Sequence, residues 1–186
     1  MSDPEFLLLG DALWLEFVNT QAGPGRADAI PDPPAWLRWT TALRLEAPRH
    51  AADLEAAHRF REKLARLAES LAGRRGPSPS GVEAVNAELA AHPAHEQLVR
   101  VGGAWQLRAV SSRPPTALEA IARSAAETLA TPSALVRACA NPDCGLYLLD
   151  ASTGQGRHWC SPARCGTTQR PERRRRSRLT PLVSDA

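Results

Sequence analysis

Four cysteines in the last third of the chain constrain its fold more than any other feature. They form two C-x4-C pairs with fifteen residues between the pairs: Cys139, Cys144, Cys160 and Cys165. Two close thiolate pairs separated by an insert of hairpin size are the pattern of a structural Zn²⁺ site. Two disulfides would suit a secreted protein instead, and four thiolates leave no open position for catalysis at a metal. We therefore predict one structural Zn²⁺ ion bound by the four cysteines.

The residues between and after the first two cysteines favour a tight turn. Asn141 and Pro142 initiate a turn, and Gly145 can adopt a positive φ directly after the second cysteine. This folds the chain back so that both sulfurs can face one point. A short strand is expected to follow at residues 146–149.

The second pair is expected to converge through a helix start. Ser161 is a good N-cap, and Pro162 suits the first helical position. Cys160 and Cys165 then occupy the two positions that meet in a hydrophobic staple, so both sulfurs can reach one ion. With a further strand expected at 157–159, a knuckle, a hairpin and a helix follow one another in a treble-clef-like order.

Positive charge is concentrated in the same part of the chain. Residues 1–138 carry 15 cations against 16 acids, whereas residues 139–186 carry 8 arginines against 4 acids. A basic segment on and after the zinc-site helix suits the phosphates of nucleic acid, and the alternative is a solvated tail without a specific partner. The candidate DNA contacts are Arg157, Arg164, Thr167, Thr168, Arg170, Arg173, Arg174, Arg175 and Arg176.

The near-neutral remainder is predicted to be mostly helical with one β-hairpin. Apolar residues recur at helical spacing in several segments, and the period changes to that of strands on both sides of Gly102 and Gly103. Thr116 and Glu119 form a capping-box pattern. The expected helices cover 11–21, 34–43, 51–72, 80–89 and 116–129, and the expected strands cover 97–101 and 104–110. The fold class is therefore α+β, with a predominantly helical N-terminal domain and a C-terminal four-cysteine zinc finger.

One charged residue is out of place in this pattern. Arg61 is in phase with the apolar face of the helix expected at 51–72, and a charge there needs a partner or a cavity. One interpretation is a salt bridge to Glu16 or to another carboxylate of the body. The other is an anion-binding pocket, with Asn19 and Thr20 as polar neighbours of Arg61.

The C-terminal sequence "CANPDCGLYLLDASTGQGRHWCSPARCGTT" resembles the CGNR zinc finger of a bacterial family of stress-induced transcription regulators. The body resembles the N-terminal ABATE domain of that family, in "LWLEFVNT" (13–20) and "FREKL" (60–64). The sequence departs from the family at Thr167 and Thr168, which stand where the family has Asn and Arg. If those two residues contact DNA in relatives, this chain lacks the Asn side-chain amide and the Arg cation at these positions. Zinc binding is unaffected by the change.

The resemblance implies a one-component regulator whose body senses a ligand, such as a small anion, and whose finger contacts DNA. A homodimer would suit the two-fold operators common among bacterial regulators. The alternative function is a small-molecule-binding protein or an enzyme of unknown reaction, with a finger that binds RNA or docks a protein. No catalytic or phosphate-loop motif supports an enzyme.

The expected domains are residues 1–136 for the body, 137–178 for the finger with its basic segment, and 179–186 for the tail. No segment has the roughly 18 uninterrupted apolar residues of a membrane helix. Without a basic stretch before the apolar residues 6–9, a signal peptide is not expected either. We therefore expect no membrane partner and a cytoplasmic protein, in which thiols stay reduced.

Overall fold

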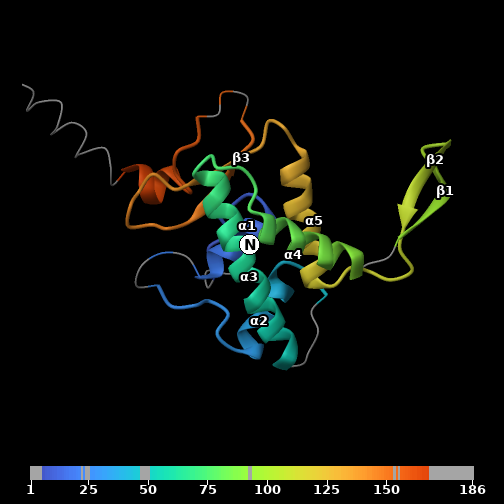
Figure 1. The fold of residues 1–186 in the computed structure, drawn as a ribbon, viewed down its shortest axis with the longest axis horizontal. Coiled ribbons are helices and arrows are strands. Elements are labelled where there is room, and N and C mark those ends of the chain that lie inside the picture. Colours follow the sequence, from blue (N-terminus) through green and yellow to red (C-terminus); the bar gives the residue numbers. More distant parts are fainter. Residues whose placement is uncertain are drawn as a thin grey trace, which may run out of the picture.

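The computed structural model describes residues 6–21, 23, 26–46, 51–91, 94–152, 154 and 156–167. Its elements form a helical body, a projecting hairpin and a small C-terminal sheet (Figure 1). In chain order they are α1 (Leu13–Val18), η1 (Asn19–Gln21), α2 (Pro33–Ala42), α3 (Ala51–Ala72), α4 (Pro79–Ala91), β1 (His95–Val101), β2 (Ala104–Val110), α5 (Ala117–Ala130), β3 (Leu135–Ala138), β4 (Tyr147–Asp150) and η2 (Pro162–Gly166).

Helix α1 lies at the centre of the body. It contacts α3, α5 and β4, and its residues from Trp14 to Val18 are all buried. The Trp14 indole N–H donates to the Thr128 hydroxyl on α5 at 3.0 Å. Aromatic rings of α2 pack on Phe17 from the other side, with the ring centroids of Trp36 and Trp39 at 5.8 and 5.6 Å. Burial of these large rings supplies much of the apolar area that holds the helices together.

The helices largely follow the predicted apolar periodicity. Helix α3 has the predicted bounds, and α5 begins with the predicted capping box between Thr116 and Glu119. The start of α2 differs by one residue, because Asp32 is the N-cap and its carboxylate accepts from the Ala35 amide at 2.8 Å. Helix α4 likewise begins one residue before the helix predicted at 80–89, with Pro79 as its first residue.

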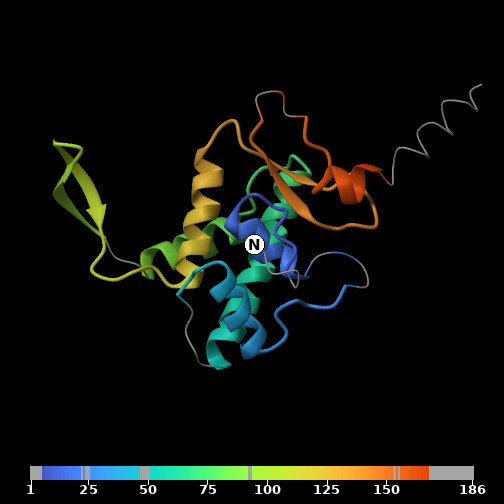
Figure 2. The same ribbon diagram turned by 180° about the vertical axis from the view of Figure 1, so that it is seen from behind.

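Strands β1 and β2 form the predicted antiparallel hairpin. Gly102 and Gly103 connect them with φ values of 57° and 87°, which residues with a Cβ rarely adopt. The hairpin projects away from the helices in both views (Figures 1 and 2). None of its strand residues is buried.

The second sheet differs from the strand pairing predicted for the zinc finger, in which residues 146–149 and 157–159 form a hairpin. Strand β4 pairs with β3, which precedes the first cysteine pair, in a register from Leu135 with Asp150 to Ala138 with Tyr147. The knuckle is therefore the tip of the β3–β4 hairpin. The strand predicted at 157–159 is wrong. Backbone groups there bond elsewhere, for instance the His158 carbonyl, which accepts from the Ala140 amide at 2.8 Å.

The β3–β4 sheet joins the body to the cysteine module. Val136, Tyr147 and Leu149 belong to the hydrophobic core of the helical body. Leu148, on the opposite face of β4, packs with the four cysteines in a second, smaller core. Because successive residues of a strand point to opposite faces, one short strand contributes side chains to both cores.

Among the described residues, no helix is long and apolar enough to cross a membrane.

Candidate metal centre

The first cysteine pair is held by the knuckle at the tip of the β3–β4 hairpin. The Cys144 amide donates to the Asn141 carbonyl at 3.0 Å, and the Cys139 amide donates to the Leu146 carbonyl at 2.8 Å. Gly145 allows the return with a φ of 68°, as the sequence predicts. The turn brings both thiols to the same side of the hairpin, where they are buried.

The second pair is positioned by the start of η2. Ser161 is the N-cap, and its hydroxyl accepts from the Arg164 amide at 3.4 Å, with Pro162 in the first helical position. The Sγ atoms of Cys160 and Cys165 consequently lie 3.6 Å apart. This confirms the helix start predicted from the sequence.

The four sulfurs lie close enough together to bind one ion between them. All four Sγ atoms lie within 4.8 Å of one another, and Cys144 Sγ is 3.6 Å from Cys160 Sγ. A tetrahedral ion with Zn–S bonds of 2.3 Å places its sulfurs about 3.8 Å apart, so the spacing fits Zn²⁺. It is far too long for a disulfide, whose sulfurs are about 2.05 Å apart. All four cysteines are free thiols in the structure.

Two N–H groups point at sulfur atoms of this site. The Cys160 amide points at Cys139 Sγ at 3.5 Å, and the Asn141 side-chain amide points at Cys165 Sγ at 3.6 Å. Burial and then the neighbouring sulfurs of Cys144 and Cys165 raise the pKa of the Cys160 thiol. A divalent cation reverses that penalty because it stabilises deprotonated sulfur. The Cys160 thiol is thus costly to ionise without a metal ion.

Arg157 fastens the cysteine module to the N-terminal segment. Its guanidinium donates to the carbonyls of Cys160 at 2.9 Å and Leu9 at 3.2 Å, and it forms an ion pair with Asp11. Its backbone N–H donates to Asp150 at 3.1 Å. Arg157 is thus bound to protein oxygens on both sides of the junction between body and module.

Asp150 is a second anchor of the module. Its carboxylate is buried and accepts from the Ser152 hydroxyl at 2.6 Å and from Arg137 Nε at 3.0 Å. The hydrogen bond from Ser152, together with those from Arg157 and Arg137, lowers the pKa of Asp150. The carboxylate therefore stays ionised and fixes the loop that leads to the second cysteine pair.

Comparison with protein families matches residues 11–132 to the ABATE family, described as "Putative stress-induced transcription regulator", and residues 136–178 to the CGNR zinc finger. The first match spans well over half of the chain. The chain belongs to the ABATE family. Among curated proteins, no relative matches it. The CGNR match and the four-cysteine cluster together indicate one zinc ion in this ABATE protein.

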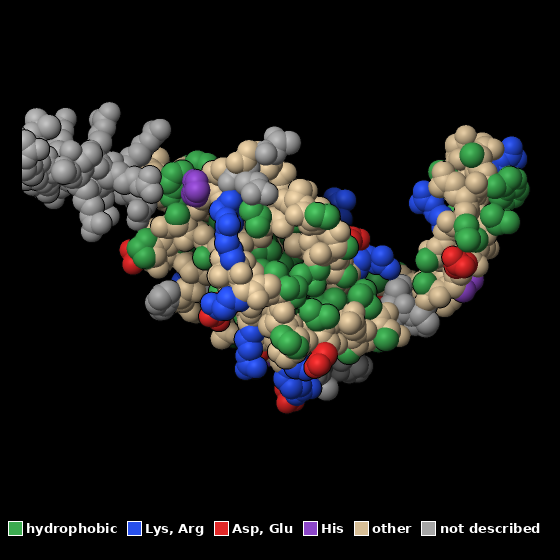
Figure 3. All heavy atoms as spheres, turned by 45° about the horizontal axis from the view of Figure 1, so that its top comes forward, with side chains coloured by type: hydrophobic (Ala, Val, Ile, Leu, Met, Phe, Trp, Pro, Cys, Tyr) green, Lys and Arg blue, Asp and Glu red, His purple; other side chains and the backbone are tan. Residues whose placement is uncertain are grey.

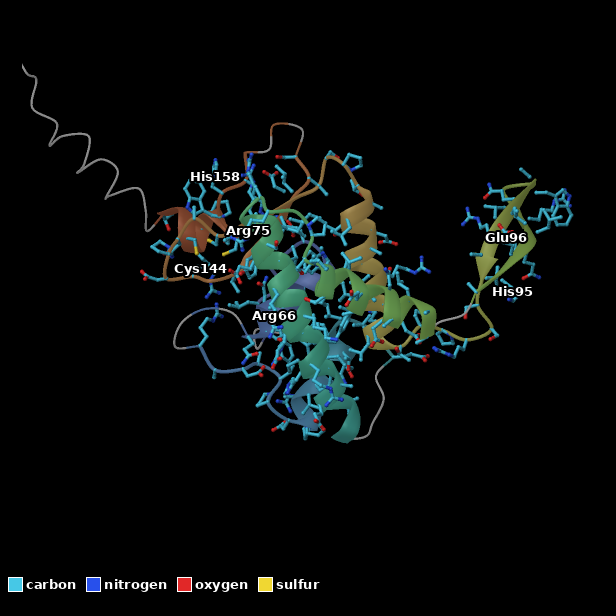
Figure 4. All side chains as sticks on the ribbon, in the orientation of Figure 1. Arg66, Arg75, His95, Glu96, Cys144 and His158 are labelled. Carbon is cyan, nitrogen blue, oxygen red and sulfur yellow. The ribbon has the colours of Figure 1, made fainter. Side chains whose placement is uncertain are left out.

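Of the predicted DNA contacts, the described residues include Arg157, Arg164 and Thr167. Arg164 and Thr167 are exposed on and directly after η2. Cys144 and His158 lie in the same module, away from the hairpin (Figure 4). The predicted contacts Thr168, Arg170, Arg173, Arg174, Arg175 and Arg176 lie outside the described residues.

The predicted ligand residues of the ABATE body lie close together but face different cavities. Arg61 is buried and donates through Nη1 to the Thr20 hydroxyl at 2.8 Å. Its carboxylate partner is Asp28, bound by both terminal nitrogens at 2.8 and 2.5 Å, and not Glu16. Asn19 faces the β3–β4 sheet, where its amide donates to the Tyr147 carbonyl and accepts from the Tyr147 amide, both at 2.8 Å.

Two cavities flank this group of residues. Asn19 and Thr20 border a small one of about 50 Å³, together with Glu16. Arg61 borders the other, of about 230 Å³, whose further lining includes Gln21, Glu62 and Arg66. The Arg61 Nε atom is buried and has no hydrogen-bond partner among the described residues.

The sequence did not point to Asp28 as the partner of Arg61. Asp28 lies in the segment between η1 and α2, where no periodicity indicates which side chains face inward. Glu16 was considered as that partner, but it accepts backbone N–H groups of Leu9 at 2.9 Å, Gly10 at 2.8 Å and Asp11 at 3.1 Å. The sequence suggested Glu16 as the partner only because Glu16 lies on the inward-facing side of the first predicted helix.

Proposed function

We propose that this ABATE protein is a DNA-binding transcription regulator whose zinc finger contacts DNA and whose body binds a small anion. The observation that carries the proposal is the packed and hydrogen-bonded junction between the two parts. The zinc centre shares a strand with the body core and is fastened to the N-terminal segment by Arg157. A change in the body can therefore alter the position of the finger.

The proposed DNA surface begins on η2 and continues into the basic segment after it. Arg164 and Thr167 are exposed there, and five arginines follow within residues 170–176. Arginines next to this helical turn can bind phosphates, while side chains of the turn itself can contact base edges. Because protein oxygens already surround its guanidinium, Arg157 holds the finger in place in this proposal and binds DNA at most with its outer edge.

The proposed anion site lies beside Arg61 and Arg66 on α3. Figure 4 labels Arg66 on this helix. The two arginines outnumber Glu62 at the cavity of about 230 Å³, and Arg61 Nε is a buried donor without a partner among the described residues. The Thr20 hydroxyl orients the guanidinium, and Asn19 connects the same 3-10 turn to β4. A small carboxylate or phosphate would therefore act next to the contact that links body and finger.

The proposal also covers the compartment and assembly. DNA binding and four reduced thiols suit the cytoplasm. Two-fold operators suit a homodimer.

Fluorescence anisotropy with labelled duplex DNA tests the DNA part. If the finger neutralises about five phosphates, log K falls with log salt at a slope near −4.5. Replacing Arg173, Arg174, Arg175 and Arg176 by alanine should flatten that slope, and Arg164→Ala should weaken binding further. Arg59→Ala is a matched control because Arg59 is exposed on α3 and pairs with Glu55. Absence of duplex binding at low salt would refute the proposal, and preference for RNA or single strands would favour the alternative function.

Thermal shift with inorganic phosphate as the probe tests the anion site. A ligand that binds only the folded state stabilises it by RT ln(1 + [L]/Kd), so the melting temperature should rise with the phosphate concentration. Arg66→Gln should reduce that stabilisation without unfolding the body, since among the described residues no carboxylate is paired with Arg66 in the way that Asp28 is paired with Arg61. Arg59→Ala should leave it unchanged. An equal phosphate effect in Arg66→Gln, Arg61→Lys and the control would remove the anion site from the proposal.

A further inference from the structure

The β1–β2 hairpin exposes large hydrophobic side chains that the fold does not use. Leu98, Trp105 and Leu107 are 62%, 68% and 61% exposed. Figure 3 shows hydrophobic side chains on the surface of this hairpin, well separated from the apolar surface of the body. An isolated two-stranded hairpin is marginally stable in water, and clustered exposed apolar groups mark interaction sites.

The hairpin register sorts these side chains onto one face. Directly opposed residues point to the same side of an antiparallel pair, and every second residue along a strand does so too. Leu98 opposes Leu107, and Arg100 opposes Trp105. Glu96 and its partner Ala109 complete this face, which we call the dimer face. Its residues are Glu96, Leu98, Arg100, Trp105, Leu107 and Ala109.

The opposite face is more polar and less suited to a protein contact. It places Gln97 opposite Arg108 and Val99 opposite Gln106. The Arg108 guanidinium donates to the Gln106 side-chain oxygen at 3.0 and 2.8 Å, so its polar groups already bond one another. The three most exposed large hydrophobic side chains of the hairpin, Leu98, Trp105 and Leu107, thus lie on the dimer face, whereas Val101, 41% exposed, lies on the opposite face.

We propose that the dimer face packs against the dimer face of a second copy of this chain, antiparallel, about a two-fold axis. The axis passes between the two Leu98 side chains and runs across the strands. This inference specifies the homodimer named in the proposed function and rests on that function only for the two-fold operator. The association itself needs no DNA.

The arrangement of charge and size on the dimer face argues for a second copy as its partner. Glu96 and Arg100 lie at opposite ends, with Leu98 between them on the same strand. The two-fold rotation reverses strand direction, so Glu96 of each copy faces Arg100 of the other. On the second strand the same rotation places the large Trp105 against the small Ala109 and Leu107 against its own copy. A face that carries both halves of each match is complementary to itself, as an isologous interface requires.

The size of the face sets the expected strength. A seven-residue strand spans roughly 24 Å, and two strands offer less than the roughly 800 Å² per partner of a standard interface. We therefore expect a dimer with a Kd in the micromolar range. On duplex DNA with two half-sites, the effective concentration of the second chain would strengthen this contact.

Sedimentation velocity of the full chain, at about 1 to 200 μM and without DNA, tests the proposal. The wild-type protein should shift from monomer to dimer over that range. Leu98→Asp should raise the dimer Kd at least tenfold, because it buries a charge opposite its own copy. Gln97→Glu, on the opposite face of the same strand, is the matched control and should leave the Kd unchanged.

A mixing experiment tests the antiparallel arrangement. Glu96→Arg and Arg100→Glu each place like charges opposite one another, so each variant alone should dimerise more weakly than wild type. Mixed in equal amounts, the two variants should form a heterodimer, because both contacts then pair opposite charges. Since the substitutions lie in exposed strands, retained zinc and retained helical circular dichroism would show that the body stays folded.

Three outcomes would overturn the inference. A wild-type protein that stays monomeric at the highest concentration would assign the dimer face to a different partner. A dimer unaffected by Leu98→Asp would place the interface elsewhere, and failure of the mixed variants to associate would rule out the antiparallel packing. The DNA proposal is separable from all three, because a monomeric variant should still bind duplex DNA with the same salt slope per chain.

Discussion

Asn19 is the residue whose geometry most directly connects the body to the zinc finger. Its side chain makes two hydrogen bonds with the backbone of Tyr147 on β4, and both residues are at least half-buried. Asn19→Ala should lower the free energy of unfolding by about 1–3 kcal/mol, because a buried donor and a buried acceptor lose their partner. Urea denaturation measures this loss.

The control for this prediction is Asn86→Ala, which removes an exposed amide from α4. It should change the free energy of unfolding by less than about 0.5 kcal/mol. An effect of Asn19→Ala no larger than that of Asn86→Ala would show that the body and the sheet are held together without this pair.

Glu16 should give the stability an unusual dependence on pH. Burial raises its pKa from 4.5 to about 7, against the opposing hydrogen bonds from Gly10 and Leu9. Since the folded-state pKa lies above the unfolded one, its contribution is fully present below about pH 4.5 and is lost as pH rises through 7. Urea denaturation at pH 5 and pH 7.5 should show a smaller difference for Glu16→Gln, which does not titrate, than for the wild type.

Two other carboxylates act in a different pH window. Although burial opposes it, the hydrogen bond from Arg61 lowers the pKa of Asp28, and bonds from Ser152 and Arg157 lower that of Asp150. Their contributions are present above the unfolded pKa of 3.8 and are lost as pH falls through their lower folded pKa values.

If the stability of the wild type and of Glu16→Gln changed equally between pH 5 and 7.5, Glu16 would not be the group responsible for the pH dependence.

At the scale of single elements, the start of α5 depends on a reciprocal cap. The Thr116 hydroxyl accepts from the Glu119 amide at 3.3 Å, and the Glu119 carboxylate accepts from the Thr116 amide at 2.8 Å. Thr116→Ala should lower the free energy of unfolding by about 1 kcal/mol, whereas Thr116→Ser keeps the hydroxyl and should cost much less. Equal losses in the two variants, measured by urea denaturation, would mean that the methyl group rather than the cap matters.

Helices and local turns were predictable because their signals are local. The apolar spacing of α3, the capping box of α5 and the helix start at Ser161 each lie within a few residues of sequence. The cysteine spacing likewise predicted the metal centre. Such features are determined by neighbouring residues and survive packing.

Strand β3 and the partner of Arg61 were not predictable, because they depend on distant contacts. Residues 135–138 are too short for a strand pattern, and they become a strand by pairing with β4 across the knuckle and packing on α3. Asp28 reaches Arg61 from an irregular segment 33 residues earlier in the chain. The strand predicted at 157–159 failed for the same reason, since Arg157 is held by the N-terminal segment.

At the scale of the whole molecule, the body and the finger are two cores on one sheet. The β3–β4 sheet presents Val136 to the helical core and Leu148 to the cysteine core. The Leu149 amide also donates to the Gly10 carbonyl at 2.8 Å. A boundary at residue 136 therefore cuts through a strand, and the finger is expected to lose order if the body is removed.

Zinc removal should reveal how far the two cores depend on each other. The purified protein should contain one equivalent of zinc per chain, because the four thiols form one closed donor set. Structural zinc of this type supplies roughly 10–16 kcal/mol of apparent folding free energy. A strong chelator should therefore disorder the cysteine core, whose buried residues apart from the four cysteines are only Leu146 and Leu148 among those described.

The helical core should survive that treatment with lower stability. None of its described buried residues is a cysteine, so most of the helical circular dichroism should remain after chelation. Asn19 and Gly10 lose ordered partners on β4, so hydrogen exchange should rise in residues 9–21 as well as in 135–166. Cys160→Ser should reproduce the same pattern without chelator. Complete unfolding on chelation would mean that the body cannot stay folded without the sheet. Unchanged hydrogen exchange in residues 9–21 would mean that disorder of the cysteine core does not affect the body across the junction.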